Sequence, residues 1–101
     1  MFTKNTMTIL IGNSDNKLSQ QDWSDFVTEL KILCRTLVPT ENEIYFMGGS
    51  NSEEDIQNYA IVLSTKNIIF NLNSFYKDLR ELRLKYLQES VAVIEGKSKF
   101  I

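Results

Sequence analysis

The segment EIYFMGGSNSEED, residues 43–55, follows a strand-like run with two glycines and then three consecutive acids. Glycines after a strand can cradle a phosphate, and clustered carboxylates can ligate a metal ion. A phosphate loop needs a basic residue close by, but no Lys or Arg lies within residues 41–65, and Glu53, Glu54 and Asp55 would repel phosphate. A calcium loop needs acids at alternating positions, whereas these three are adjacent.

We therefore interpret this segment as a long connection between two strands, in which Gly48 and Gly49 permit a turn or a bulge. Long loops on small scaffolds often carry recognition. The chain has a net charge of −2, distributed as zero over residues 1–40, −5 over residues 41–65 and +3 over residues 66–101. Because such a local excess attracts the opposite charge, Glu53, Glu54 and Asp55 are candidate partner-binding residues.

A second candidate surface lies on the predicted helix 74–87. Its apolar stripe consists of Phe75, Leu79, Leu82 and Tyr86. About 100° around the same helix lies a second set: Tyr76, Arg80, Arg83 and Leu87. Tyr and Arg are enriched among the residues that dominate protein–protein binding, so this set is the other predicted partner-binding surface.

The residue types argue against catalysis. The chain has no histidine, which removes the commonest general base near neutral pH and the commonest metal ligand. The single cysteine, Cys34, falls on the apolar stripe of a predicted helix, so we expect a buried thiol and not a nucleophile. We predict no catalytic residue, no metal and no cofactor.

Hydrophobic periodicity predicts six elements in the order β-α-β-β-α-β. The expected strands and helices are, in chain order, 6–11 (strand), 19–37 (helix), 42–48 (strand), 59–65 (strand), 74–87 (helix) and 90–96 (strand). Residues 66–73 fit either an extension of the third strand or the lead-in to the second helix, which Asn73 or Ser74 would cap. Residues 97–101 fit a short last strand after a turn at Glu95–Gly96, or a tail.

A chain of 101 residues fits one α+β domain, residues 1–101. Two right-handed crossovers joined by a hairpin give a ferredoxin-like fold, a four-stranded antiparallel sheet with both helices on one face. The other face of the sheet is then bare. Since the strands carry apolar residues on both faces, we expect that bare face to be covered by a second subunit or to bind a ligand.

Two patches resemble a small bacterial α+β family of unknown function. They are LSQQDWSDFV, at the start of the first helix, and LRLKYLQESVAVIEG, which ends the second helix and enters the last strand. That family has a Trp-containing helix and a Tyr/Phe-x-Gln-Glu-Ser-Val junction. The resemblance covers about a quarter of the chain and implies an α+β fold, with no catalytic residues to carry over.

The leading hypothesis is a small, non-catalytic cytoplasmic protein that binds and occludes a protein partner. Toxin-immunity proteins and phage-encoded inhibitors neutralise basic nucleases or toxins in this way. The alternative is a ferredoxin-like homodimer that holds a small molecule between paired sheets. The basic–glycine–aromatic pattern of RNA-binding domains is missing and the pI is about 5.1, so nucleic acid is not an expected partner. No apolar run is long enough to predict a membrane span or a signal peptide.

Overall fold

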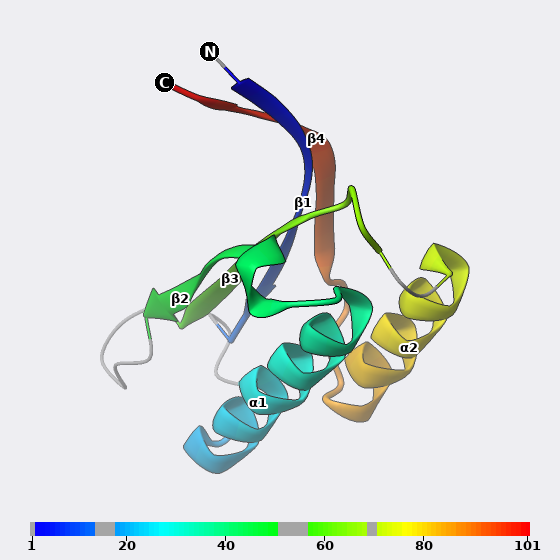
Figure 1. Cartoon of the computed structure of the whole chain (residues 1–101). Coiled ribbons are helices and arrows are strands. Elements are labelled where there is room, and N and C mark those ends of the chain that lie inside the picture. Colours follow the sequence, from blue (N-terminus) through cyan, green and yellow to red (C-terminus); the bar gives the residue numbers. More distant parts are fainter. Residues whose placement is uncertain (1, 14–17, 51–56, 69–70) are drawn as a thin grey trace.

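The structure is a computed structural model that describes residues 2–13, 18–50, 57–68 and 71–101. Its elements are, in chain order, β1 (Phe2–Gly12), α1 (Gln20–Leu37), the short 3₁₀ helix η1 (Glu41–Glu43), β2 (Ile44–Ser50), β3 (Asn58–Ser64), α2 (Leu72–Lys85) and β4 (Ala92–Phe100). The four strands form an antiparallel sheet in the order β2-β3-β1-β4, and both helices lie on the same side of it (Figure 1). This confirms the predicted α+β architecture with a four-stranded antiparallel sheet and two helices.

Strand β1 lies in the middle of the sheet and forms its most buried part. Successive side chains of a strand point to opposite faces, so Met7, Ile9 and Ile11 share one face. All three are buried in the core beneath the helices. Ile9 lies opposite Ile61 of β3 on one side and opposite Val93 of β4 on the other. The core is therefore built on β1, with β3 and β4 completing its floor.

Helix α1 begins and packs as its sequence predicts. The Ser19 hydroxyl accepts a hydrogen bond from the Asp22 amide at 3.1 Å, which caps the first turn. The apolar stripe turns inward, and the Phe26 ring stacks on Tyr86 with 4.8 Å between centroids. Cys34 is fully buried in the same stripe, as predicted, and burial raises the pKa of its thiol to about 12. The thiol therefore stays protonated and unreactive near neutral pH.

The two helices are also joined by a polar contact at their edge. The Lys85 ammonium of α2 lies 2.7 Å from the Glu29 carboxylate of α1, and the Tyr86 hydroxyl donates to the same carboxylate. These two hydrogen bonds stabilise the ionised form, so they lower the pKa of Glu29 below its ordinary value of 4.5.

The start of α2 lies earlier than predicted. Asn71 is the N-cap, and its side-chain oxygen accepts from the Asn73 amide at 2.7 Å. The helix thus begins at Leu72, so a cap at Asn73 or Ser74 is wrong. Of the segment left open by the sequence, residues 72–73 are helical and residues 67–68 are not part of the sheet. An Asn can cap at any of these positions, and the packing of Leu72 against the core selects the earlier one.

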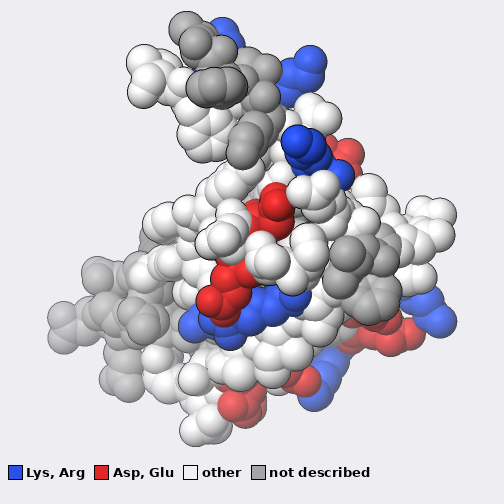
Figure 2. All heavy atoms as spheres, viewed as in Figure 1, with Lys and Arg blue, Asp and Glu red and all other residues white. Residues whose placement is uncertain are grey.

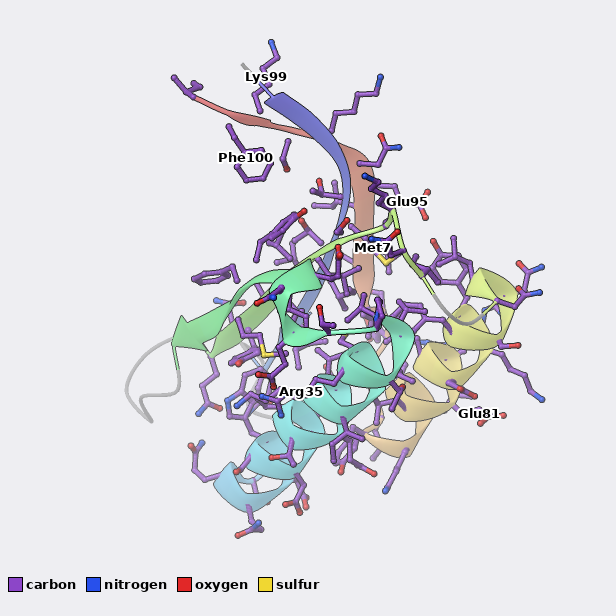
Figure 3. The ribbon with its side chains drawn as sticks, viewed as in Figure 1. Met7, Arg35, Glu81, Glu95, Lys99 and Phe100 are labelled. Carbon is purple, nitrogen blue, oxygen red and sulfur yellow. The ribbon has the colours of Figure 1, made fainter. Side chains whose placement is uncertain are left out.

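The last strand is longer than predicted and does not turn at Glu95–Gly96. Gly96 lies opposite Thr6, and the pairing continues to Phe100, which lies opposite Phe2. The ends of β1 and β4 therefore project together beyond the rest of the sheet (Figure 1). Phe100 packs edge-on against Tyr45, with 5.6 Å between ring centroids (Figure 3). Both alternatives for residues 97–101, a strand after a turn at Glu95–Gly96 and a tail, are therefore wrong, because backbone pairing with β1 continues through Gly96.

The two adjacent glycines lie in a strand and not in the connecting turn. Gly48 and Gly49 belong to β2 and lie opposite Ala60 and Tyr59 of β3. The register shift of β2 falls at residues 44–46 instead. A Cβ atom on Gly49 would come within 1.8 Å of the Asn58 carbonyl oxygen, so the close approach of two backbones explains this glycine.

Gly49→Ala is expected to destabilise the protein by about 1–3 kcal/mol, because the added methyl group can fit only if β2 moves away from β3. Urea unfolding followed by circular dichroism measures this. Gly48→Ala is the matched control, since its Cβ would meet the ring of the exposed Phe46, which can move. Equal stability of the two variants would contradict the observed β2–β3 approach.

The lowered pKa of Glu29 predicts an acid-sensitive contact between the helices. Its contribution is present above pH 4.5 and is lost as pH falls through the lowered pKa of the folded state. Glu29→Gln is therefore expected to reduce stability at pH 7 and to flatten the loss of stability below pH 4.5. Glu81→Gln, on the exposed side of α2, is the control and should keep the wild-type pH dependence. Thermal unfolding at pH 3 to 7 tests both, and a parallel pH profile for Glu29→Gln and wild type would refute the assignment.

Candidate functional site

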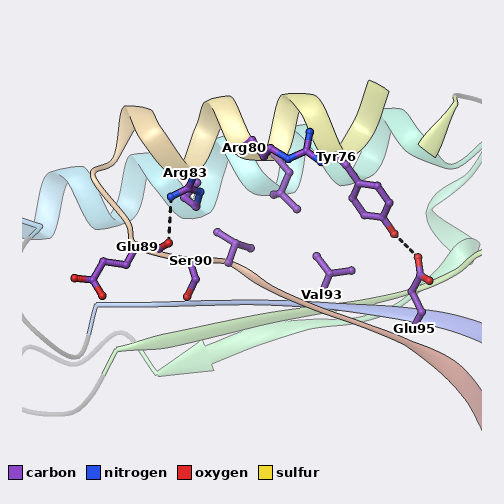
Figure 4. A pocket seen from close by; sticks show the side chains of 9 residues that line it. Tyr76, Arg80, Arg83, Glu89, Ser90, Val93 and Glu95 are labelled. Carbon is purple, nitrogen blue, oxygen red and sulfur yellow. Dashed lines mark hydrogen bonds between the residues drawn. The ribbon is translucent and has the colours of Figure 1, made fainter. Parts of the chain in front are cut away.

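A groove of about 520 Å³ runs between α2 and β4, and we call it the α2–β4 groove (Figure 4). Its lining residues are Tyr76, Leu79, Arg80, Arg83, Glu89, Ser90, Val91, Val93 and Glu95. Leu79, Val91 and Val93 pack on the core and form an apolar floor. The charged and aromatic side chains stand along its two rims.

The helical repeat determines which residues of α2 form its rim of the groove. Positions 76, 80 and 83 lie within one narrow side of α2, because residues three and four apart share a face. Phe75, Leu79 and Leu82 are buried against the sheet and fix the rotation of the helix. That rotation places Tyr76, Arg80 and Arg83 on the side of α2 that lines the groove. In Figure 4, Tyr76 and Arg83 reach toward β4 and the turn before it, and Arg80 lies along the helix between them.

Tyr76 bridges the groove at one end. Its hydroxyl donates to the Oε1 atom of Glu95, which projects from β4 (Figure 4). Burial, together with this hydrogen bond and the negative charge of Glu95, raises the pKa of Tyr76 to about 12. The tyrosine is therefore a neutral donor at physiological pH, and it anchors α2 to β4.

Arg83 closes the groove at the other end. Its Nη1 atom donates to the carbonyl oxygens of Gln88 and Glu89, at 3.1 Å each. Both carbonyls belong to the turn between α2 and β4, so Arg83 stabilises the path by which the chain enters the last strand. This guanidinium has a structural task that the sequence did not predict.

In the described part of the chain, Arg80 has no comparable structural contact. Its side chain is exposed, and within the described residues it makes neither a hydrogen bond nor an ion pair. It lies between Tyr76 and Arg83 on the rim (Figure 4). An unpaired guanidinium beside an apolar floor can receive a carboxylate from another molecule.

Leu87 lies beyond the end of α2 in an unusual conformation. Its φ angle is 55°, in the left-handed region that favours glycine. The Gln88 amide donates to the Arg83 carbonyl at 3.0 Å and the Leu87 amide to the Leu84 carbonyl at 3.1 Å, which is a Schellman ending. The side chain is 76% exposed. A large, exposed apolar residue thus occupies a backbone conformation that favours glycine, and its side chain is not part of the core.

The structure brings together three of the predicted binding residues. Tyr76, Arg80 and Arg83 line the α2–β4 groove, whereas Leu87 lies at the end of α2 and does not. The predicted single face is therefore split, because the helix ends before Leu87. The three acids of the other predicted surface, Glu53, Glu54 and Asp55, lie outside the described residues.

Sequence reasoning missed the β4 side of the groove. Glu95, Val93 and Glu89 line it, but no spacing in the sequence ties them to residues of α2. The available signal was the alternation of VAVIEGKSK, which places Val93 and Glu95 on one face of the strand.

The sheet face opposite the helices forms a second surface, which we call the uncharged sheet face. Two cross-strand rows occupy it: Phe46–Val62–Thr8–Ile94 and Gly48–Ala60–Leu10–Ala92. Phe46 and Ile94 are 53% and 54% exposed. Neither row contains a charged residue. Apolar residues thus lie on this face as well as on the core face, and the two rows cross all four strands.

The described residues contain no group of three or more Cys, Asp or Glu side chains that could hold a metal ion. No helix in the described part of the chain is long and apolar enough to cross a membrane. Acidic and basic side chains lie next to one another on the face that Figure 2 shows. On that face the charges of the two signs are interspersed and do not form separate fields.

Comparison with protein-family models, curated proteins and solved structures finds no match to this chain. The resemblance to a small bacterial family stays a sequence-based interpretation.

Leu87→Gly is expected to stabilise the fold by about 1 kcal/mol, because glycine adopts the left-handed conformation without the cost that a Cβ atom brings. Denaturant unfolding measures the change. Leu84→Gly is the control: Leu84 is also exposed but lies inside α2, so glycine there should destabilise by a similar amount. A loss of stability in Leu87→Gly would contradict the observed ending of α2.

Proposed function

We propose that the chain is a small, non-catalytic protein-binding module that holds a segment of a protein partner in the α2–β4 groove. The observation that carries the proposal is Arg80, an exposed guanidinium without a partner among the described residues, beside an apolar floor. Arg and Tyr on the rim of an apolar depression are the residue types that dominate binding energy at interfaces. Binding there acts by occlusion, since the partner surface that enters the groove is covered.

The free edge of β4 supports an extended segment as the occupant. In the sheet order β2-β3-β1-β4, β4 has one strand neighbour, β1. Its outer edge borders the groove and carries backbone N–H and C=O groups that can pair with an added strand. An extended segment would gain main-chain hydrogen bonds from β4 and place an acidic side chain near Arg80.

A ferredoxin-like fold is part of this proposal. The element order β-α-β-β-α-β and the antiparallel order β2-β3-β1-β4 support it. In such a fold the second helix lies over the last strand, which is what creates a groove at that edge.

A basic partner is the favoured class. The net charge of −5 over residues 41–65 supports it, because an acidic region speeds the approach of a basic protein and orients it. A nuclease or toxin that must be neutralised, as by an immunity protein or a phage-encoded inhibitor, fits this class. Glu53, Glu54 and Asp55 would then steer the partner while the α2–β4 groove holds it.

A second candidate function is a homodimer that encloses a small molecule between paired sheets. The uncharged sheet face favours it, because two cross-strand rows without a charge can pack against each other at no cost in ion desolvation. Phe46 and Ile94, at opposite edges of this face, would border the enclosed volume.

The groove function is tested with a random peptide library displayed on phage. Selected peptides are expected to contain an acidic residue within an extended, alternating apolar pattern. Arg80→Glu is expected to weaken their binding about tenfold or more, because it removes a charge-assisted hydrogen bond and adds a repulsive charge. Fluorescence anisotropy with the synthesised peptides measures the affinity, and hydrogen exchange locates the site by protection of residues 92–98.

Lys77→Glu is the matched control. Lys77 is one turn from Arg80 on the same helix and changes the net charge equally, but it does not line the groove. It should leave peptide affinity unchanged. Peptides that bind Arg80→Glu as well as wild type, or that protect β2 instead of β4, would refute the proposal.

A further inference from the structure

Gly96 is a glycine that the single chain does not require. It lies in the middle of β4, and a Cβ atom there would meet nothing within 4 Å. Its φ angle lies outside the left-handed region, and the β1–β4 register passes through it without a shift. Glycine inside a strand is less favourable than alanine, and it often marks the close approach of another backbone.

The strand around Gly96 is open to such an approach. Seven of the nine residues of β4 are exposed, and its outer edge pairs with no strand of the described residues. Glu95 and Lys97 flank Gly96 on the face of the sheet that carries the helices. Figure 3 shows Glu95 on this strand, with Lys99 and Phe100 farther along toward the projecting end.

The sequence of β4 is self-complementary about Gly96. When two copies of AVIEGKSKF run antiparallel with Gly96 opposite Gly96, Glu95 of each copy lies opposite Lys97 of the other. Opposite charges directly across a strand pair are stabilising, and like charges are destabilising. Ile94 lies opposite Ser98 on the other face. This register therefore contains two attractive pairs and no directly opposed like charges.

Neighbouring registers lack this property. With the helices of both copies on the same side, pairing can shift only by steps that keep side chains on matching faces. One such shift places Glu95 opposite Glu95. The other keeps two attractive pairs, Glu95 with Lys99, but places Lys97 opposite Lys97. The charges thus select the register centred on Gly96.

We infer that β4 pairs with β4 of a second copy across a two-fold axis at Gly96, so that two four-stranded sheets join into one. This goes beyond the proposed function, because it names a second occupant for the edge that borders the α2–β4 groove. Glu95 can serve both contacts, because Tyr76 donates to its Oε1 atom and leaves Oε2 for Lys97 of the second copy. At the axis Gly96 lies opposite Gly96, so no side chains face each other at the centre of the contact.

The first test is a charge exchange, read as the dimer dissociation constant by sedimentation equilibrium. Lys97→Glu places two pairs of like charges at the axis and should weaken association about tenfold or more. Adding Glu95→Lys to Lys97→Glu recreates two opposite pairs and should restore most of the affinity. Lys77→Glu, with the same change in net charge but no place in the β4 pair, should leave the constant unchanged.

The second test locates the contact with single cysteines, since Cys34 is buried and does not react. Gly96→Cys should form a disulfide between two copies under mild oxidation, because residues opposite each other in antiparallel strands lie within disulfide reach. Leu10→Cys lies on the uncharged sheet face and should not cross-link.

A monomer at every accessible concentration, or a dimer that Leu10→Cys cross-links and Gly96→Cys does not, would overturn the inference. So would a Lys97→Glu variant that associates as the wild type does, since Glu95 and Lys97 would then not face each other across the contact. These outcomes are separate from the proposed function. A monomer whose selected peptides still depend on Arg80 would remove the second copy and leave the groove function standing.

Discussion

Strand β1 has hydrogen-bonded neighbours on both sides, β3 and β4, and buries Met7, Ile9 and Ile11 beneath the helices. Strand β3 likewise has two strand neighbours, so β2 and β4 form the two edges of the sheet. Helix α2 then returns the chain to β4 and must cover the β1–β4 part of the floor. The α2–β4 groove, the free edge of β4 and the uncharged sheet face all follow from this one placement. These three surfaces are thus consequences of how the core is closed.

The elements that carry this core were predictable from local pattern. In α1, apolar residues recur at helical spacing and Ser19 offers a capping hydroxyl, so the predicted helix 19–37 agrees with the observed one to within a residue. The stripe of α2 correctly predicted that Tyr76, Arg80 and Arg83 share a side. Helical periodicity is a property of the segment itself, so no tertiary information was needed. Element order then limited the sheet to few arrangements.

What escaped prediction depends on contacts between distant segments. Asn13 and Gln57 are buried, and the Asn13 amide nitrogen donates to the Gln57 side-chain oxygen at 2.8 Å and to the Leu18 carbonyl at 3.0 Å. This cluster ties the end of β1 to the start of β3 and to the approach to α1. From the sequence alone, polar residues beside turns are expected to be exposed. The hydrogen-bond partners that allow Asn13 and Gln57 to be buried lie 44 residues apart in the chain, so local pattern does not reveal them. The continuation of β4 beyond Gly96 was missed for the same reason, since the pairing of Gly96 with Thr6 is not a local property.

The two proposed occupants of the β4 edge, a partner segment and a second copy, are linked by mass action. A second copy paired at Gly96 would occupy the same backbone groups that a partner segment needs, so the two occupants compete. Self-association then lowers the apparent affinity for the partner in proportion to the fraction of chains that are paired. It also protects an exposed strand that would otherwise add to other sheets. Arg80 of α2 takes no part in the proposed β4–β4 register, which depends on Glu95 and Lys97. A substitution of Arg80 would therefore change partner binding and leave self-pairing unchanged. The two proposed interactions would thus use different side chains on a common backbone.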